Sequence, residues 1–520
     1  RPPGRPGRVH RISTIKIRVL PRRHRCLTIA VGLSGLGALI AVGACSSAGS
    51  TATDDGETTA VSSSTTRPSP TSIASTTIAS TTIESTLAST IPPPVTTPLP
   101  DGLRWCGYIP GAPTAPEHAD SVPLAALPVV VPAIASVAAE TTALQLATFE
   151  QLQVAVADNY VDPLFNGKDW AGIVERYRDI VNAGLSDDDF YLAMNGMVSE
   201  LGDGHSYVLS PAQVAEADAE LAGRVDFVGI GGFFQPIPEA GGASVILVFR
   251  GSPAERAGLR AHVTVVAVDG ESPLGVPPER WQNPFLGQEG SSISITVSSP
   301  GGGTKTLDLN RARVEGAKPL DVCLVPGTRI AYVLLPGLFD ATLADQLESA
   351  LAALADGGPL GGVVIDNRMN GGGSSSVLKP ILSLFTAGEV GNFRSRNATR
   401  PLIIEPKDVN GSQTVPVVVL VGAHTISYGE VMTGILQANG RAKVIGQTTQ
   451  GNVETLNRFD LDDGAQLWLA TETFDARGAT YGPWEDTGII PDRDLRTRWD
   501  LFDESSDPAL AAAVELLSQS

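Results

Sequence analysis

Three strongly apolar runs in the C-terminal half of the chain constrain the fold more than any other feature. They occupy residues 329–335, 361–366 and 415–421, and each is followed by a segment with helical spacing of its apolar residues. Strands that alternate with helices predict a sheet covered by helices. We therefore expect residues 320–500 to form an α/β domain.

The segments on either side of this domain have other patterns. Within 141–215 apolar residues recur at three- and four-residue steps, which predicts a small bundle of amphipathic helices. Within 224–313 the pattern changes to short β-runs with one helix-like turn, which predicts a separate β-domain. Residues 101–140 are expected to be an irregular lead-in, and residues 501–520 a helical C-terminal tail.

The first 100 residues have the composition of targeting and linker segments. Residues 1–45 contain nine Lys and Arg, no acid, and an apolar stretch, which is the pattern of a signal peptide. The small residues before Cys45 resemble a bacterial lipobox, in which the cysteine is lipidated; the alternative is an ordinary signal peptide cleaved nearby. Residues 46–100 are rich in Ser, Thr and Pro and cannot bury a core, so we expect a disordered linker. Together these features predict a protein of the cell envelope, lipid-anchored to the membrane from outside the cytoplasm, or secreted.

Charge and cysteine usage restrict the partners. After residue 45 the chain has 28 basic residues against 56 acidic ones, and such a surface disfavours nucleic acid. Cys106 and Cys323 are the cysteines outside the leader; they can pair in an oxidising compartment, but their spacing leaves the pairing open. No Cys/His cluster has zinc spacing, so neither a metal nor an organic cofactor is expected. The oligomeric state is left open.

The sequence GAHTISYGEVMTG at 422–434 follows the third apolar run and places Ser427 at the start of a predicted helix. Backbone N–H groups at a helix N-terminus can stabilise an anion, which suits a nucleophile. A serine hydroxyl is a poor nucleophile without a base, however. His424 is one candidate base nearby. The simpler interpretation is that Ser427 only caps the helix.

Residues 251–272, GSPAERAGLRAHVTVVAVDGES, resemble the PDZ domains of proteases, in which SPA-x-x-AGL precedes an apolar run ending in DG. PDZ domains bind peptide ends by adding a strand to the edge of a sheet. A generic small β-domain is the alternative. The resemblance places a peptide-binding loop at Gly229, Ile230, Gly231, Gly232 and Phe233.

Four segments in order resemble one family, the C-terminal-processing and tricorn-type serine peptidases. They are LGDGHSYVLSP at 201–211, the PDZ-like module, VVIDNRMNGGGSS at 363–375, and residues 423–452 together with GPWEDTGIIPD at 482–492. The resemblance implies a crotonase-like (ClpP-like) α/β core. It also implies a serine-type endopeptidase that hydrolyses a protein or peptide substrate through an acyl-enzyme.

The two branches of this family activate the serine differently. The processing branch uses a lysine 25 residues after the serine, but this chain has Asn452 there, and the glutamine that supports the lysine is also missing. The tricorn branch uses a histidine as base and a glutamate that orients it. GHSY supplies His205, with Gly204 in place of the motif's serine, and EDTGIIPD supplies Glu485. The resemblance therefore implies that Ser427 acts with His205 and Glu485.

Acyl transfer through Ser427 also needs backbone donors for the oxyanion. The N–H of Tyr428, just after the nucleophile, is expected to be one donor. The other is expected from Gly371 or Gly372, where glycine lets the backbone approach the substrate.

A different class of function is also consistent with the sequence. Because the lysine is missing and Gly204 departs from the tricorn motif, the chain could be a catalytically inactive lipoprotein that binds peptides or another ligand. The positions of His205 and Glu485 relative to Ser427 in the folded chain distinguish the two hypotheses. The substrate and its cleavage specificity cannot be read from these motifs.

Overall fold

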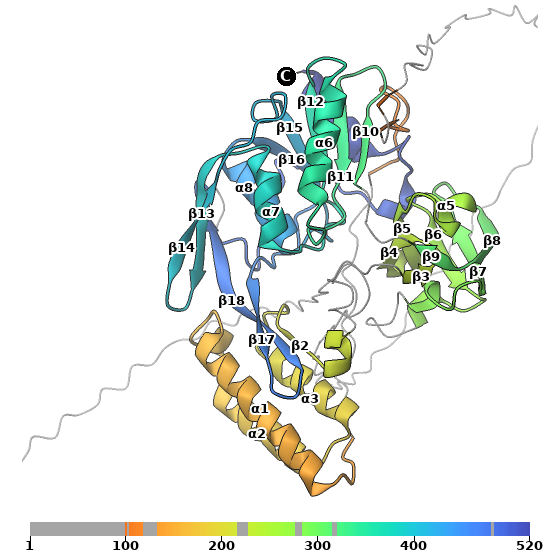
Figure 1. Ribbon diagram of the computed structural model, residues 1–520. Helices are drawn as coiled ribbons and strands as arrows, with labels where there is room; N and C mark the ends of the chain where they lie inside the picture. Colours follow the sequence, from red (N-terminus) through yellow and green to blue (C-terminus); the bar gives the residue numbers. More distant parts are fainter. Residues whose placement is uncertain are drawn as a thin grey trace, which may run out of the picture.

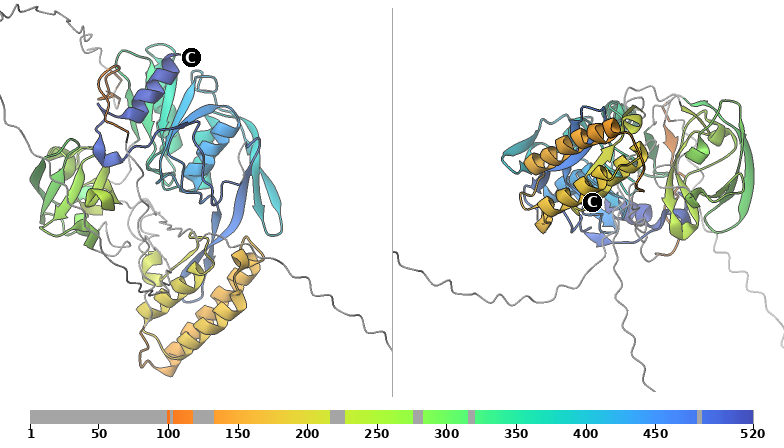
Figure 2. Two further views of the ribbon diagram at one scale, coloured as in Figure 1. Left: turned by 180° about the vertical axis from the view of Figure 1, so that it is seen from behind. Right: turned by 90° about the horizontal axis from the view of Figure 1, so that it is seen from below.

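The computed structural model describes residues 99–100, 103–117, 133–215, 227–275, 283–314, 320–479 and 483–519. The predicted signal peptide, Cys45 and the linker up to residue 98 lie outside the described residues. Figure 1 shows three parts: a helical segment, a small β-domain and a larger α/β core. The same three parts can be followed from behind and from below in Figure 2. None of the helices that the structure describes has the length and hydropathy of a membrane span.

A seven-stranded mixed sheet forms the centre of the α/β core. The strand order is β1-β10-β11-β12-β15-β16-β19, and all neighbours are parallel except the antiparallel pair β10–β11. The strands are β1 (Arg104–Trp105), β10 (Asp321–Leu324), β11 (Ile330–Leu334), β12 (Gly362–Asp366), β15 (Val417–Val421), β16 (Ala442–Gly446) and β19 (Arg493–Asp494).

Helices cover both faces of this sheet. Successive side chains of a strand point to opposite faces, so Val363 and Val417 pack on one face, and Val364 and Val418 on the other. The first face is covered by three helices and the second by a fourth at the C-terminus. In chain order these are α6 (Leu343–Ala355), α7 (Ser375–Ser383), α8 (Tyr428–Ala438) and α9 (Pro508–Ser518). The α/β architecture predicted from the alternation of strands and helices is confirmed.

A second sheet connects the core to the helical segment. Its order is β14-β13-β18-β17, and β2 pairs with β18 off this path. In Figure 1, β17 and β18 extend from the core to the helices, where Leu467 and Leu469 are buried in the helical core. The elements are α1 (Ala139–Asn159), α2 (Trp170–Asn182), α3 (Asp187–Ser199), β2 (Tyr207–Leu209), β13 (Gly388–Ser395), β14 (Thr399–Ile404), β17 (Thr455–Asp460) and β18 (Gln466–Ala476).

The β-domain is an antiparallel sheet in the order β4-β5-β6-β7-β8, with a separate β3–β9 pair. It contacts the core through His262, whose ring stacks on Trp499 with centroids 3.9 Å apart. Trp499 in turn donates its indole N–H to the carbonyl of Val245 at 2.9 Å. The elements are β3 (Phe227–Gly229), β4 (Gly232–Ile237), β5 (Gly242–Val248), α5 (Pro253–Arg256), β6 (Thr264–Val268), β7 (Ser292–Ser298), β8 (Thr304–Asn310) and β9 (Ala312–Val314).

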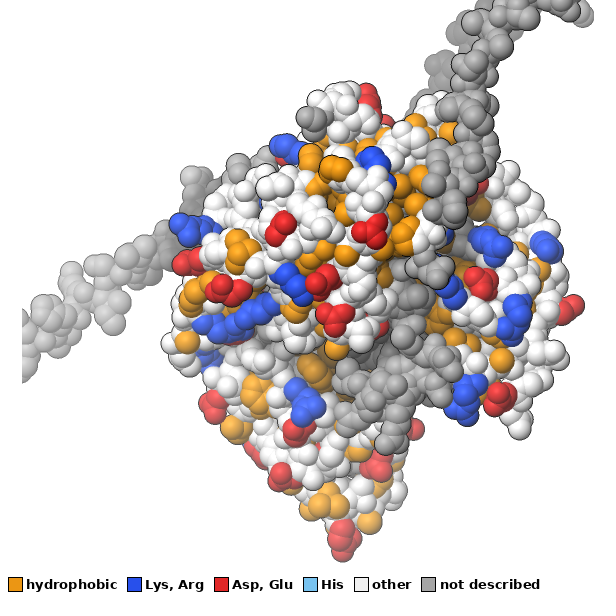
Figure 3. Space-filling model, turned by 45° about the horizontal axis from the view of Figure 1, so that its top comes forward, with side chains coloured by type: hydrophobic (Ala, Val, Ile, Leu, Met, Phe, Trp, Pro, Cys, Tyr) orange, Lys and Arg blue, Asp and Glu red, His pale blue; other side chains and the backbone are white. Residues whose placement is uncertain are grey.

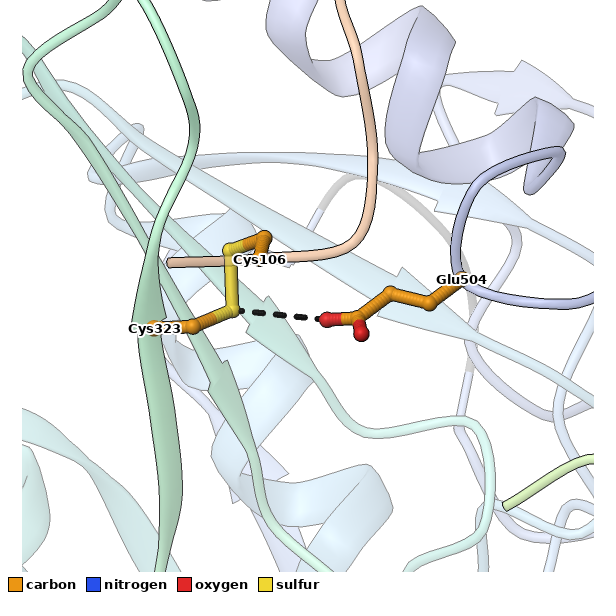
Figure 4. A group of neighbouring side chains, drawn as sticks. All are labelled: Cys106, Cys323 and Glu504. Carbon is orange, nitrogen blue, oxygen red and sulfur yellow. Dashed lines mark hydrogen bonds between the residues drawn. A yellow bond between two sulfur atoms is a disulfide. The ribbon is translucent and has the colours of Figure 1, made fainter. Parts of the chain in front are cut away.

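Cys106 and Cys323 form a disulfide, which answers a question that their spacing left open. The bond joins the segment after β1 to β10, and a carboxylate oxygen of Glu504 lies 3.5 Å from the Cys323 sulfur (Figure 4). The same carboxylate is paired with Arg104 at 2.9 Å. Although the two cysteines and Glu504 are close enough to surround an ion, a metal would need thiolates, and the disulfide has none. The group therefore acts as a covalent and ionic attachment of β1 to the sheet.

Candidate active site

Ser427 lies at the junction of β15 and α8 in a backbone conformation that is rare for a residue with a side chain. Its φ is 55° and its ψ is −126°. Such conformations cost about 1–3 kcal/mol and persist where the surrounding structure holds them. Here the N–H of Ser427 is shared between the carbonyl of Asn452 at 2.9 Å and Glu430 Oε2 at 3.1 Å. The turn is thus held by the segment in which the processing branch has its lysine.

Glu430 is fully buried beneath this turn and connects it to residues 449–452. Its carboxylate accepts hydrogen bonds from the hydroxyl of Thr449 at 2.6 Å, the N–H of Gly451 at 2.6 Å and the N–H of Asn452 at 2.9 Å. Burial raises the pKa of Glu430 to about 7, although these hydrogen bonds act in the opposite direction. Glu430 therefore positions the nucleophile turn and its neighbouring segment as one unit.

The glycine-rich loop after β12 runs directly beside Ser427. A Cβ at Gly372, where φ is +94°, would lie 2.7 Å from the Cβ of Ser427, so only glycine fits there. The N–H of Gly372 is already engaged by Asn370 Oδ1 at 2.9 Å. The N–H groups of Gly371 and Tyr428, in contrast, have no acceptor among the described residues. Of the three expected oxyanion donors, these two are available in this structure.

A buried arginine, Arg368, supports the glycine-rich loop. The guanidinium of Arg368 pairs with Asp366, at the end of β12, at 2.5 Å and with Asp507, at the start of α9, at 2.6 Å. All three side chains are almost completely buried, so removing one partner would leave an uncompensated charge. Asp366 and Arg368 therefore hold the loop rather than form part of the reacting site.

His205 lies in the turn between α3 and β2, and Asp203 organises this turn. The Asp203 carboxylate accepts hydrogen bonds from the N–H groups of His205 at 2.8 Å and Ser206 at 3.0 Å, and from the Ser206 hydroxyl at 2.6 Å. The Ser206 oxygen also accepts the N–H of Ala470 on β18 at 3.0 Å. Asp203 thus braces the turn, as its position in the sequence suggests, and β18 carries the histidine turn to the core.

One short segment, Asn452 and Val453, is contacted from three sides. Its partners are the turn that contains His205 (the histidine turn), the turn that contains Ser427 (the nucleophile turn) and Glu485. The side-chain amide of Asn452 donates to the carbonyl of Gly204 at 3.4 Å, while its backbone carbonyl accepts the N–H of Ser427. The next residue, Val453, donates its N–H to Glu485 Oε2 at 2.8 Å. Groups that are far apart in the sequence therefore converge on two consecutive residues.

The side-chain hydrogen bonds of a complete triad are not formed in this structure. Among the described residues no other side chain hydrogen-bonds to the Ser427 hydroxyl, and the buried His205 Nδ1 has no partner. Burial lowers the pKa of His205 to about 4, against a raising effect from Asp203, and burial raises the pKa of Glu485 to about 8. Catalytic hydrogen bonds are often long in substrate-free enzymes and tighten when substrate binds. The geometry brings the three groups into one region without joining them.

The other candidate base, His424, has a different charged neighbour from that of His205. Burial lowers its pKa, and the charged group that acts against this is Glu239 of the β-domain. For His205 the corresponding charge is Asp203, within its own turn. The two histidines therefore lie in different environments, and His205 is the one whose turn contacts the segment around Asn452.

Sequence motifs did not identify Glu454, which is also part of this region. Its side chain is buried and its Oε2 has no hydrogen-bond partner among the described residues. Burial raises the pKa of Glu454 well above its ordinary value, and the nearby carboxylates of Glu485 and Asp203 add to the effect. The sequence GNVETL contains no recognisable motif around this residue, so only the fold could identify it.

The loop predicted to bind peptides lies at the start of the β-domain sheet. Gly229 ends β3, and Gly232 and Phe233 begin β4, which is an edge strand of the described sheet. Between them the chain turns at Ile230 and Gly231, whose carbonyls accept N–H groups from the residues around α5. Phe233 is buried against core residues.

Two separate stretches of the chain match family models of proteases. Residues 329–495 match peptidase family S41, and residues 147–199 match the tricorn protease C1 domain. A carboxyl-terminal-processing protease of Picosynechococcus sp. is 27% identical over 377 residues, covering 70% of this chain and 87% of that protein. The chloroplastic carboxyl-terminal-processing peptidase 3 of Arabidopsis thaliana is 26% identical over 354 residues, covering 65% of this chain and 66% of the relative. Among solved structures, a photosystem II D1 C-terminal processing protease has 25% identity and a TM-score of 0.49, covering 69% of this chain and 94% of its own.

The helix-covered sheet, the strand–turn–helix around Ser427 and these matches define the class: the chain is a serine-type peptidase. Its residues 329–495 are similar to peptidase family S41, and the curated proteins similar to the chain are carboxyl-terminal-processing proteases.

Proposed function

We propose that this peptidase is an extracytoplasmic endopeptidase that cleaves peptide bonds through an acyl-enzyme on Ser427, with His205 as general base. The observation that carries the proposal is the convergence of the Ser427 turn, the His205 turn and Glu485 on Asn452 and Val453. A histidine base explains how the serine could be activated in a chain that has asparagine at the lysine position.

In the proposed reaction the substrate carbonyl lies beside Ser427 with its oxygen toward the N–H groups of Gly371 and Tyr428. His205 accepts the hydroxyl proton while the serine oxygen bonds to the carbonyl carbon. The imidazolium then returns the proton to the leaving amine, and water releases the acyl group by the same steps. Glu485 would stabilise the imidazolium. Substrate binding must bring the His205 ring to the hydroxyl, because the two are not hydrogen-bonded in this structure.

Two further observations support the proposed compartment and substrate. A disulfide between Cys106 and Cys323 is typical of proteins in oxidising compartments, which agrees with an anchor at Cys45 or a cleaved leader. Acidic and basic side chains are interspersed over the face shown in Figure 3, with no extended basic patch on its described part, which suits a protein or peptide substrate better than nucleic acid.

We also propose that the β-domain is a PDZ domain that binds the end of a peptide substrate along β4. The support is the position of β4 at the edge of its sheet, directly after the turn at Ile230 and Gly231. A peptide can extend a sheet by adding a strand beside its edge strand. Binding of a peptide with a free C-terminal carboxylate, but not of its amide, would support this assignment.

The nucleophile is tested by labelling the full chain with a serine-reactive phosphonate. We expect Ser427→Ala to abolish labelling, and Ser383→Ala, a serine at the end of α7 away from the site, to leave it unchanged. Labelling of Ser427→Ala at the wild-type rate would overturn the assignment. If the wild type binds peptides but neither reacts with the phosphonate nor cleaves them, the alternative of ligand binding without catalysis is favoured.

A further inference from the structure

Glu454 is a buried carboxyl group beside the proposed site that the mechanism above does not use. It lies two residues after Asn452, and 7% of its surface is exposed. Its Oε2 has no hydrogen-bond partner among the described residues. A buried carboxyl oxygen without a partner costs free energy, so its persistence in a fold requires an explanation.

Glu454 lies two residues from Asn452, whose side chain contacts the turn that contains His205. The Asn452 side chain contacts the histidine turn through the carbonyl of Gly204. Residues 452–454 lead directly into β17, so Glu454 stands between the Asn452 contact and the start of that strand. The carboxylate of Asp203, in the histidine turn, acts electrostatically on both His205 and Glu454, which agrees with this placement.

Three buried polar atoms in this region have no partner among the described residues. They are Nδ1 of His205, Oδ1 of Asn452 and Oε2 of Glu454. If Nδ1 of His205 carries a hydrogen, it can donate a hydrogen bond to a carboxylate oxygen such as Oε2 of Glu454. A movement of the His205 ring toward Ser427 would let it form new hydrogen bonds. Glu485 is less free to respond, because one of its oxygens already accepts the N–H of Val453.

We propose that Glu454 is a positioning residue that accepts the Nδ1–H of His205 when substrate closes the site. This inference rests on the proposed function, in which His205 is the base. As the Ser427 O–H bond breaks and the Nε2–H bond forms, the carboxylate of Glu454 holds the Nδ1–H and shares with Glu485 the stabilisation of the imidazolium. The same hydrogen bond fixes the tautomer in which Nε2 is free to accept the proton.

The proposal has a consequence for pH dependence. Glu454 is surrounded by carboxyl groups from several elements, namely those of Glu485, Asp203, Asp486 and Asp162. Burial and these like charges favour its protonated form and raise its pKa. The base-competent state needs Glu454 ionised and Nε2 unprotonated, so activity should rise with pH as the pair of Glu454 and His205 loses its shared proton.

The test uses the full chain with Glu454→Gln, the conservative Glu454→Asp, and Glu389→Gln as an exposed control on β13. The readouts are the pH profile of kcat/KM on a fluorogenic peptide and the Cε1 chemical shift of His205 by NMR. We expect Glu454→Gln to lower kcat by about 10²-fold or more with little change in KM, and to move the acid limb of the profile to lower pH. Glu454→Asp should retain the acid limb of the pH profile at its wild-type position. Glu389→Gln should match the wild type in both readouts.

The two readouts separate this inference from the function on which it rests. If Glu454→Gln leaves both the profile and the His205 titration unchanged in an enzyme that labels at Ser427, the role of Glu454 is overturned and the proposed function stands. If Ser427 proves not to be the nucleophile, the proposed function fails. The His205 titration still decides whether Glu454 and His205 share a proton: a titration step present in the wild type and lost in Glu454→Gln supports the pairing, and an unchanged titration overturns it.

Discussion

The backbone carbonyl of Asn452 accepts a hydrogen bond of 2.9 Å from the N–H of Ser427. In the processing branch this position carries the lysine base, whereas here its backbone holds the nucleophile and its side chain reaches the carbonyl of Gly204. Asn452 therefore joins the serine turn to the histidine turn. The position at which the processing branch has its lysine therefore supports, in this chain, the turn that contains the proposed base His205.

The two candidate bases can be distinguished by mutation. We expect His205→Ala to lower kcat/KM by about 10⁴-fold, the usual cost of losing a member of a triad. His424→Ala should remain close to the wild type, because the charge that acts on His424 is Glu239 of the β-domain, whereas the turn that contains His205 contacts Asn452. Peptide cleavage and phosphonate labelling are measured for both variants. A large loss of kcat/KM in His424→Ala with a small loss in His205→Ala would instead identify His424 as the base.

Gly372 should be intolerant of any side chain. In Gly372→Ala the new Cβ would meet Ser427, so we expect kcat to fall about 10²–10³-fold and stability to fall by about 1–3 kcal/mol. Gly301→Ala is a matched control, since Gly301 also has a positive φ, +82°, but has open space around its Cβ. It should lose about 1 kcal/mol of stability and keep its activity. Equal losses of activity in both variants would argue against a contact specific to Ser427.

Glu485 should make the fold less stable as pH rises. Its pKa is about 8 in the folded protein against an ordinary value of 4.5, so the folded state binds more protons than the unfolded state between these values. The free energy of unfolding therefore falls from about pH 4.5 to about pH 8. Glu430, with a pKa of about 7, contributes in the same direction. Urea unfolding at pH 5 and pH 8 should show a smaller difference in Glu485→Gln than in the wild type, whereas the exposed Glu389→Gln should show the wild-type difference.

The disulfide should contribute measurably to stability. It joins Cys106 and Cys323 across 217 residues, so it restricts the unfolded chain strongly. We expect the double variant Cys106→Ala, Cys323→Ala to lose about 2–5 kcal/mol of unfolding free energy. Reductant should lower the melting temperature of the wild type and leave that of the double variant unchanged. Identical melting curves for reduced and oxidised wild type would contradict the prediction.

The main elements of the core could be predicted from local sequence. The apolar runs are strands, and Ser427 does begin a helix, because both depend on short-range spacing and burial. The glycine-rich loop at 371–373 could also be expected near the nucleophile. What local spacing could not predict is that the N–H of Gly372 is bonded to Asn370, whereas that of Gly371 has no acceptor within the part of the chain that the structure describes. That difference depends on the exact path of the loop.

The position of His205 could not be predicted from local patterns for a physical reason. Its turn is placed by β2, which pairs with β18 through contacts such as Tyr207 with Trp468. Pairing between strands so far apart in sequence leaves no periodic signal in either segment. The disulfide and the burial of Glu454 are non-local in the same way.

The sequence by itself determined the kinds of group available: a serine at a helix N-terminus, a glycine loop, a histidine and a glutamate, with asparagine where a lysine base would be. Only the tertiary structure decided which of them meet. Apolar burial and strand pairing act between any segments that the fold brings together, and here β18 brings the histidine turn to the segment around Asn452. The proposed nucleophile, Ser427, is a local feature, whereas its proposed base is placed by the whole fold.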